Sequence, residues 1–272
     1  MAASADRRRR VTAHYDELSG HYAELWGEHI HHGYYARGDE TRDEATQALV
    51  ERLVEDMQLP RGATVLDVGC GIGGTARLLS RQYDCRVTGV TLSSVQACMA
   101  RERGNGRYAP RFVVGDAAAL PFVGAFDALV AVEVLSHVDD RAAFFAQAAR
   151  LLEPEGRMGI AAWLKSSDVS AAQERALVAP IEEGMLVTLP TRQEYERLLA
   201  ATGLRLDGYR DISSEVARTW DLCLELVTKP AVWSLAVQKG SDTLAFVRSF
   251  RAMRAGFSHG AFRYALITAT KS

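Results

Sequence analysis

The chain has 272 residues, 48% of them hydrophobic and 24% charged, which is enough to bury one full core with an appended lobe. A formal net charge of -2 excludes the broad basic surface that nucleic acid requires, so we expect no nucleic-acid partner. No run approaches the roughly 18 apolar residues of a spanning helix, so we expect no stable membrane insertion. Four scattered cysteines without a Cys-x-x-Cys pair predict a reducing, cytoplasmic setting.

The N-terminal part contains a basic run and then helical patterns. Residues 1–10 are predicted to form a mobile basic tail because Arg7 to Arg10 are consecutive arginines. Residues 11–60 are predicted to form a helical lid, with an aromatic-rich stripe from Val11 to Trp26 and a second helix over 41–57. The stripe residues could belong to a core, or at least one of them could close over a ligand.

From residue 61 helical and strand patterns alternate, which predicts an α/β fold with a parallel sheet covered on both faces. Residues 61–163 form the predicted cofactor-binding core, with strands at 63–68, 85–91, 111–114, 126–132 and 157–163. Helices are expected at 73–82, 93–103 and 140–152. Residues 164–272 continue the core with helices over 171–184 and 194–201 and strands near 204–210 and 262–270. Insertions near 164–189 and 212–259 cannot sit inside a sheet, so we expect them to form a helical cap over one edge.

A glycine-rich turn follows the first strand of this core. Asp67 ends the strand, and Gly69, Gly71 and Gly74 complete a Gly-x-Gly-x-x-Gly pattern. Residues without Cβ let a ligand approach the bare backbone. This spacing fits a nicotinamide dinucleotide, which usually also needs an acid at the end of the second strand. The chain has Thr91-Leu92-Ser93 there, which weakens that interpretation but leaves a nicotinamide-dependent oxidoreductase as an alternative.

Three motifs in order resemble those of class I S-adenosylmethionine-dependent methyltransferases. They are Val65 to Gly74, Gly115 to Phe122 and Phe126 to Val138. His32 to Tyr35, Val90 to Gln96 and Ala265 to Thr268 further resemble the small-molecule group that contains tocopherol methyltransferases, in which the second strand ends in Thr-Leu-Ser. The resemblance covers most of 11–271. It implies a Rossmann-like core of seven mostly parallel strands, the last antiparallel, with N-terminal helices and an inserted helical cap.

The same resemblance implies S-adenosyl-L-methionine as the cofactor. Asp67 would lie near its ammonium group, and Asp116 would accept a hydrogen bond from its adenine. Both residues could instead cap local structure. The full expected cofactor-binding set is Asp67, Gly69, Gly71, Gly73, Thr91, Leu92, Gln96, Asp116, Ala117, Glu133, Tyr15 and Trp26.

A base would assist methyl transfer if the acceptor must lose a proton. Ligands of open α/β sheets bind at the carboxyl ends of the strands, so we expect His137 as the catalytic base and Glu133 as its alternative. His137 could also be only a structural loop residue. The acceptor is expected to contact His32, Tyr34, His137 and Trp163, and to be a partly hydrophobic natural product because the cap sequence contains Trp220, Trp233, Phe246, Phe250 and Phe257.

Several alternatives stay open from the sequence. The fold could keep the cofactor while catalysing a non-methyl step such as a cyclisation. The methyl group could go to carbon, oxygen or nitrogen, and the enzyme could be a monomer or a homodimer. His29, His31 and His32 have near-ligand spacing, but they lack a supporting cysteine or carboxylate pattern, so we expect no metal site.

Overall fold

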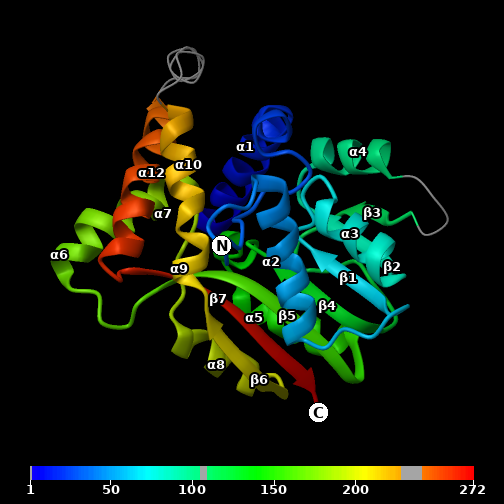
Figure 1. Cartoon of the computed structure of the whole chain (residues 1–272). Coiled ribbons are helices and arrows are strands. Elements are labelled where there is room, and N and C mark those ends of the chain that lie inside the picture. The colour runs from blue at the N-terminus through cyan, green and yellow to red at the C-terminus, as the bar shows by residue number, and fades with distance from the viewer. Residues whose placement is uncertain (1, 105–108, 228–240) are drawn as a thin grey trace.

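A computed structural model describes residues 2–104, 109–227 and 241–272. A seven-stranded sheet in the order β3-β2-β1-β4-β5-β7-β6 forms its centre, and only β7 runs antiparallel to its neighbours (Figure 1). This arrangement confirms the expected Rossmann-like core of seven mostly parallel strands. The strands are β1 (Thr64–Val68), β2 (Arg86–Thr91), β3 (Arg111–Val114), β4 (Phe126–Val132), β5 (Leu152–Lys165), β6 (Leu204–Asp211) and β7 (Phe262–Lys271).

Helices precede the sheet, cover both of its faces and build the cap. They are α1 (Ala2–Trp26), α2 (Arg42–Asp56), α3 (Gly74–Tyr83), α4 (Ser94–Arg103), α5 (Arg141–Leu151), α6 (Ala171–Gln173), α7 (Ala179–Met185), α8 (Arg192–Ala201), α9 (Ser213–Val216), α10 (Arg218–Val227) and α12 (Ser241–Ser258). A 3-10 turn (Leu135–His137) follows β4, and a π-helical turn (Glu174–Val178) joins α6 to α7.

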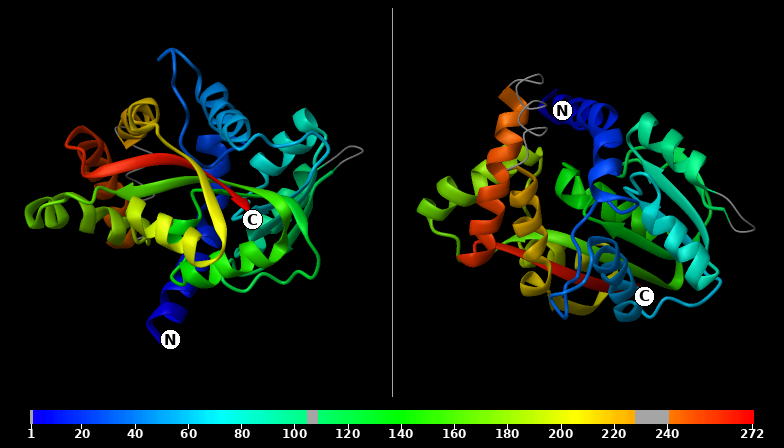
Figure 2. Two further views of the ribbon diagram at one scale, coloured as in Figure 1. Left: turned by 90° about the horizontal axis from the view of Figure 1, so that it is seen from below. Right: turned by 45° about the horizontal axis from the view of Figure 1, so that its top comes forward.

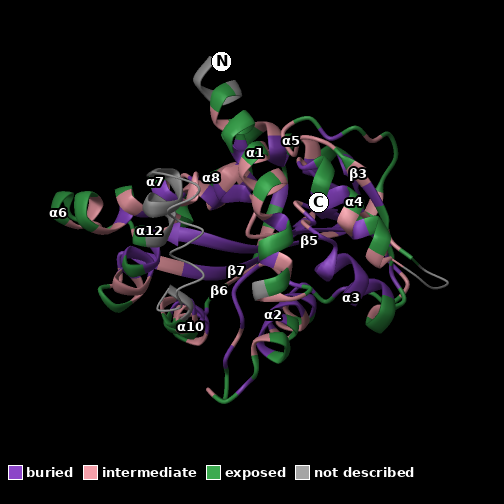
Figure 3. Cartoon of the chain, turned by 90° about the horizontal axis from the view of Figure 1, so that it is seen from above, coloured by how far each residue is buried: buried purple, intermediate pink, exposed green. Residues whose placement is uncertain are grey.

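Successive side chains of the central strands pack into separate apolar clusters, one on each face of the sheet. Leu66 and Val68 of β1 join the apolar cluster under α5 and α8, whereas Val65 joins the cluster under α2 and α3. Successive side chains of a strand point to opposite faces, so a strand that is apolar throughout must be covered on both. Figure 3 shows the strands buried between these layers.

The cap helices α7, α10 and α12 stand together on one side of the molecule (Figure 1). Ile181 of α7, Trp220 of α10 and Met253 of α12 share one apolar cluster with Trp163 of β5 and Phe262 of β7. Figure 2 shows α1 between this cap and α4. Helix α1, the cap and α4 therefore lie side by side although they are far apart in sequence. Trp233 and the side chain of Phe246 lie outside the described residues.

The structure differs from the sequence-based expectation in three segments. Residues 2–10, expected to be a mobile tail, belong to α1, because Arg7 pairs with Asp139 and Arg8 with Asp116. Strand β5 is longer than the expected 157–163 and continues back to Leu152 across a register shift in its pairing with β4. The expected helix over 171–184 is divided by the π-helical turn.

Candidate active site

A cavity of about 310 Å³ opens at the carboxyl ends of β1, β2 and β4, where open α/β sheets bind their ligands. The glycine turn forms one wall, α1 forms a second, and the cap forms a third. Most residues predicted for the site line it: Tyr15, Trp26, His32, Gly69, Gly71, Thr91, Leu92, Gln96, Asp116, Ala117, Glu133, His137 and Trp163. Asp67, Gly73 and Tyr34 do not.

The glycine turn presents bare backbone to this cavity at Gly71. Its φ is +53°, and a Cβ built there would have only the Gln96 amide nitrogen as a neighbour, 4.0 Å away. Gly69 also has a positive φ, and its Cβ would lie 2.4 Å from the Val134 side chain. Gly73 does not line the cavity, and a Cβ built there would lie 2.6 Å from the ring of Phe112. The open cradle at Gly71 fits an S-adenosylmethionine molecule lying against the main chain.

Asp67 is buried beneath this turn. Asp67 lies near the first turn of α3, where the backbone N–H of Ala76 acts to lower the pKa of its carboxyl. Its Oδ2 atom is buried without a hydrogen-bond partner, and burial raises the pKa of the carboxyl to about 7. Buried polar atoms normally have partners, so Oδ2 can still accept from a bound ammonium group or a bridging water.

The ends of β2 and β3 contribute polar groups that already have partners. Thr91 Oγ1 donates to Gln96 Oε1 at 2.7 Å, and Ser93 caps α4 while donating to Asp16 of α1. Asp116 accepts from the backbone N–H of Ala118 at 2.9 Å and from Arg8 at 2.6 Å. Helix α1 is therefore tied to the two strand ends that the resemblance assigns to adenosine.

Glu133 follows β4 with a left-handed φ of +54°, an uncommon conformation for a residue with a Cβ. Its Oε1 accepts three hydrogen bonds, from the His32 backbone N–H at 2.7 Å, His32 Nδ1 at 2.9 Å and the Tyr264 hydroxyl at 2.7 Å. The indole of Trp220 donates to His32 Nε2 at 2.6 Å. Burial acts to raise the pKa of Glu133, but its contacts with His32 lower the pKa to about 2. This geometry favours an ionised anchor over a base.

His137, in the 3-10 turn after β4, has both ring nitrogens engaged. Nδ1 lies 3.2 Å from the Leu186 carbonyl oxygen, and Nε2 lies 3.0 Å from the Tyr15 hydroxyl. A carbonyl oxygen can only accept, so Nδ1 carries the proton and Nε2 presents its lone pair. Burial lowers the pKa of His137 to about 4, which keeps the ring neutral near pH 7.

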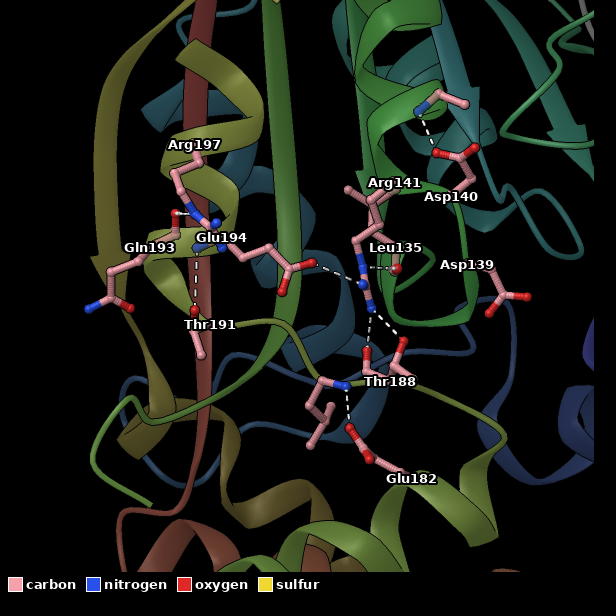
Figure 4. A network of polar contacts seen from close by, with 12 residues as sticks. Leu135, Asp139, Asp140, Arg141, Glu182, Thr188, Thr191, Gln193, Glu194 and Arg197 are labelled. Carbon is pink, nitrogen blue, oxygen red and sulfur yellow. Dashed lines mark hydrogen bonds and ion pairs between the residues drawn. The ribbon is translucent and has the colours of Figure 1, made fainter. Parts of the chain in front are cut away.

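The guanidinium of Arg141 links the segments next to His137 through several hydrogen bonds (Figure 4). It donates to the Leu135 carbonyl at 2.9 Å, to the hydroxyl of Thr188 at 2.7 Å and to Glu194 at 3.1 Å. The Thr188 backbone N–H also donates to the Ser136 carbonyl at 2.8 Å. These bonds hold the turn that carries His137 against the segment between α7 and α8.

Other predicted residues have structural partners. His29 Nδ1 and His31 Nε2 lie 3.2 Å apart, and His31 Nδ1 donates to the His32 carbonyl. Within the described ranges, no group of three or more His, Cys, Asp or Glu residues could hold a metal ion. Tyr34 does not line the cavity. It packs at the edge of the cap cluster, and its backbone N–H donates to the carbonyl of Ala45 in α2.

Sequence reasoning missed Arg8 and Tyr264. Arg8 lies seven residues before Tyr15, so extending the helical stripe of α1 by two turns would have found it. Tyr264 gave no such signal, because its neighbour Glu133 is 131 residues away.

None of the helices in the described parts is long and apolar enough to cross a membrane.

Comparison with known proteins places this geometry in a family. The model of the family described as mycolic acid cyclopropane synthetase matches residues 3–254. The chain is 32% identical over 267 residues to 27-O-demethylrifamycin SV methyltransferase of Amycolatopsis mediterranei, covering 94% of this chain and 95% of that one. It is 29% identical to the chloroplastic tocopherol O-methyltransferase of Arabidopsis thaliana, covering 97% and 82% of the two chains.

Solved structures show the same fold. The [4+2]-cyclase SpnF is 25% identical with a TM-score of 0.81, covering 96% of this chain and 94% of that one. The mycolic acid cyclopropane synthase CmaA1, complexed with SAH and CTAB, is 22% identical with a TM-score of 0.85, covering 97% and 98%. These relationships favour S-adenosylmethionine over a nicotinamide cofactor. The chain belongs to the mycolic acid cyclopropane synthetase family, and it is a class I S-adenosylmethionine-dependent methyltransferase that acts on a small molecule.

Proposed function

We propose that this enzyme methylates a hydroxyl group of a partly hydrophobic small molecule such as a natural product. The supporting observation is that one cavity joins the glycine cradle at Gly71 to an aromatic wall and to a neutral histidine, His137. Trp163, Trp220 and Phe250 line the wall beneath the cap. Relatives whose names specify O-methylation support oxygen as the acceptor atom.

When bound, S-adenosylmethionine supplies an electrophilic methyl group on a positively charged sulfur. The residues of the chain then have three tasks: to hold the acceptor oxygen in line with that carbon, to exclude water, and to take up a proton. Gly69 and Gly71 would hold the cofactor through backbone, with Asp67 toward the ammonium group and Thr91, Leu92, Gln96, Asp116 and Ala117 toward the ribose and adenine. Helix α1 and the cap enclose the site.

The cellular setting also belongs to this proposal. All four cysteines, Cys70, Cys85, Cys98 and Cys223, have free thiols, which suits the reducing cytoplasm. We propose a cytoplasmic enzyme that works as a monomer or homodimer.

The test is mass spectrometry of purified enzyme incubated with S-adenosylmethionine and a panel of apolar phenols and alcohols. The expected result is a gain of one methyl group together with S-adenosylhomocysteine, and no gain on the corresponding methyl ethers. Conversion of a substrate without methyl gain and without cofactor consumption would instead support a non-methyl step such as cyclisation.

A further inference from the structure

The basic nitrogen of His137 faces a tyrosine. Its Nδ1 proton is committed to the Leu186 carbonyl, so Nε2 is the only site on the ring that can accept a proton. The Tyr15 hydroxyl lies 3.0 Å from that nitrogen. Because Nε2 is unprotonated, Tyr15 must be the donor in this hydrogen bond, and its own oxygen lone pairs stay available.

The position of Tyr15 is fixed by the contacts of α1 with the rest of the fold. The two rings meet nearly edge to face, with centroids 5.6 Å apart and an interplanar angle of 80°. Asp16, the next residue of α1, accepts from Ser93 at the start of α4, and Arg7 pairs with Asp139 beyond the 3-10 turn. Helix α1 is thus fastened on both sides of the cavity that Tyr15 lines.

The charged and titratable groups that act on His137 leave its ring neutral. His14 and Arg7 of α1 act to lower its pKa, whereas Glu133 and the bond to Leu186 act to raise it, and burial outweighs both. The buried Tyr15 hydroxyl has a pKa raised by burial and by Glu133. A tyrosinate is therefore not the resting form, and Tyr15 can pass on a proton only as it receives one.

We propose that Tyr15 is the catalytic residue that contacts the acceptor hydroxyl, and that His137 takes up the proton through it. As the acceptor oxygen bonds to the methyl carbon and the sulfur–carbon bond breaks, the acceptor proton moves to the Tyr15 oxygen. The Tyr15 proton moves at the same time to His137 Nε2. Tyr15 ends neutral and His137 ends as an imidazolium that still donates to Leu186, so the positive charge lost by sulfur appears on the histidine. This relay rests on the proposed function.

The geometry favours this relay over direct attack by His137 on the acceptor proton. Direct attack would require the Tyr15–His137 bond to break while the Arg141 network keeps the imidazole in place. Glu133 is a poorer candidate, because its Oε1 already accepts three hydrogen bonds.

Kinetics of Tyr15→Phe and His137→Gln test the relay with the acceptor found in the methylation panel. Each variant is expected to lower kcat about 100-fold, as loss of general base catalysis does. The double variant should be no slower than the slower single variant, because both act in one proton path. The matched control is Tyr195→Phe, a buried tyrosine away from the cavity whose hydroxyl has no hydrogen-bond partner, and its kcat should not change.

Two readouts separate a relay from simple packing of Tyr15. Rates in mixtures of light and heavy water should curve with deuterium content in the wild type, because two protons move, and should be linear in Tyr15→Phe. Because Tyr15 also belongs to the expected cofactor-binding set, calorimetry measures the S-adenosylmethionine Kd of both proteins, and their rates are compared at saturating cofactor. An unchanged kcat in Tyr15→Phe, multiplicative losses in the double variant, or a rate loss explained by cofactor Kd would each overturn the relay.

Nitrogen-15 NMR of His137 tests the pairing without any acceptor. The expected spectrum shows Nδ1 protonated and Nε2 unprotonated, with the Nε2 resonance shifting in Tyr15→Phe but not in Tyr195→Phe. A protonated Nε2 at neutral pH would refute the relay. If the NMR spectrum is as expected but the enzyme methylates no hydroxyl acceptor, the result would contradict the proposed function and leave the Tyr15–His137 hydrogen bond intact.

Discussion

Replacing Asp67 with asparagine should change how the stability of the free protein depends on pH. The Asp67 carboxyl is buried with an unpartnered Oδ2, and burial raises its pKa from an ordinary value of 3.8 to about 7. Between these pH values the folded chain holds a proton that the unfolded chain has released. The wild type therefore loses stability as the pH rises through this range, by about 4 kcal/mol at about 1.4 kcal/mol per pH unit.

Asparagine cannot titrate, so Asp67→Asn removes only this part of the pH dependence. The assay is urea denaturation of both proteins from about pH 4 to about pH 8. The free energy of unfolding of the variant, minus that of the wild type, should rise by about 4 kcal/mol across the range and level off above pH 7. Any fixed cost of burying the amide shifts the whole curve and leaves its slope unchanged.

The assignment of a raised pKa to Asp67 would be refuted if the free energy of unfolding of the variant, minus that of the wild type, stayed constant with pH or fell as the pH rises. The same titration with saturating S-adenosylmethionine tests its proposed role. An ammonium group near Oδ2 would stabilise the carboxylate, so the pH dependence of the difference should shrink when the cofactor is bound. An unchanged slope would contradict the proposed contact between Asp67 and the cofactor's ammonium group.

Three further substitutions test other parts of the site. Gly71→Ala should weaken cofactor binding at least tenfold by calorimetry, whereas Gly203→Ala, with a similar positive φ of +72° and open space around it, should cost about 1 kcal/mol of stability but leave cofactor affinity unchanged. Tyr264→Phe should lower the free energy of unfolding by about 2 kcal/mol, because it removes a hydrogen bond to a buried carboxylate, and a loss no larger than that of Tyr195→Phe would contradict this. Arg8→Ala should cost less than about 1 kcal/mol in urea denaturation, since the arginine is 55% exposed, and a larger loss would show that α1 depends on this ion pair.

Local sequence signals were sufficient where the neighbours in sequence decide the structure. The strands at 111–114 and 126–132 have the expected bounds, and the helices expected over 93–103 and 194–201 form as α4 and α8, whose N-cap residues are Ser93 and Thr191. The glycine turn also behaves as its residue types require, since Gly71 adopts a positive φ facing the cavity.

Tertiary contacts decided the features that the sequence could not predict. The basic run before Val11 looks like a tail because its partners, Asp116 and Asp139, lie more than 100 residues away. The anchoring of Glu133 by His32 likewise depends on a loop meeting a strand end across the fold. Hydrophobic periodicity contains no information about such pairs, so Glu133 looked like a possible base.

The bond from His137 to the Leu186 carbonyl has a consequence for engineering new acceptor specificity. Leu186 ends α7 in a left-handed conformation, with a φ of +55°, inside the cap that we propose to cover the acceptor. A transplanted cap that moved this carbonyl would release the Nδ1 proton and let the imidazole adopt its other tautomer, with Nε2 protonated. Exchanging caps between relatives can therefore abolish proton uptake by His137 even when the new acceptor binds well. To avoid this, the Leu186 carbonyl must keep its position relative to His137.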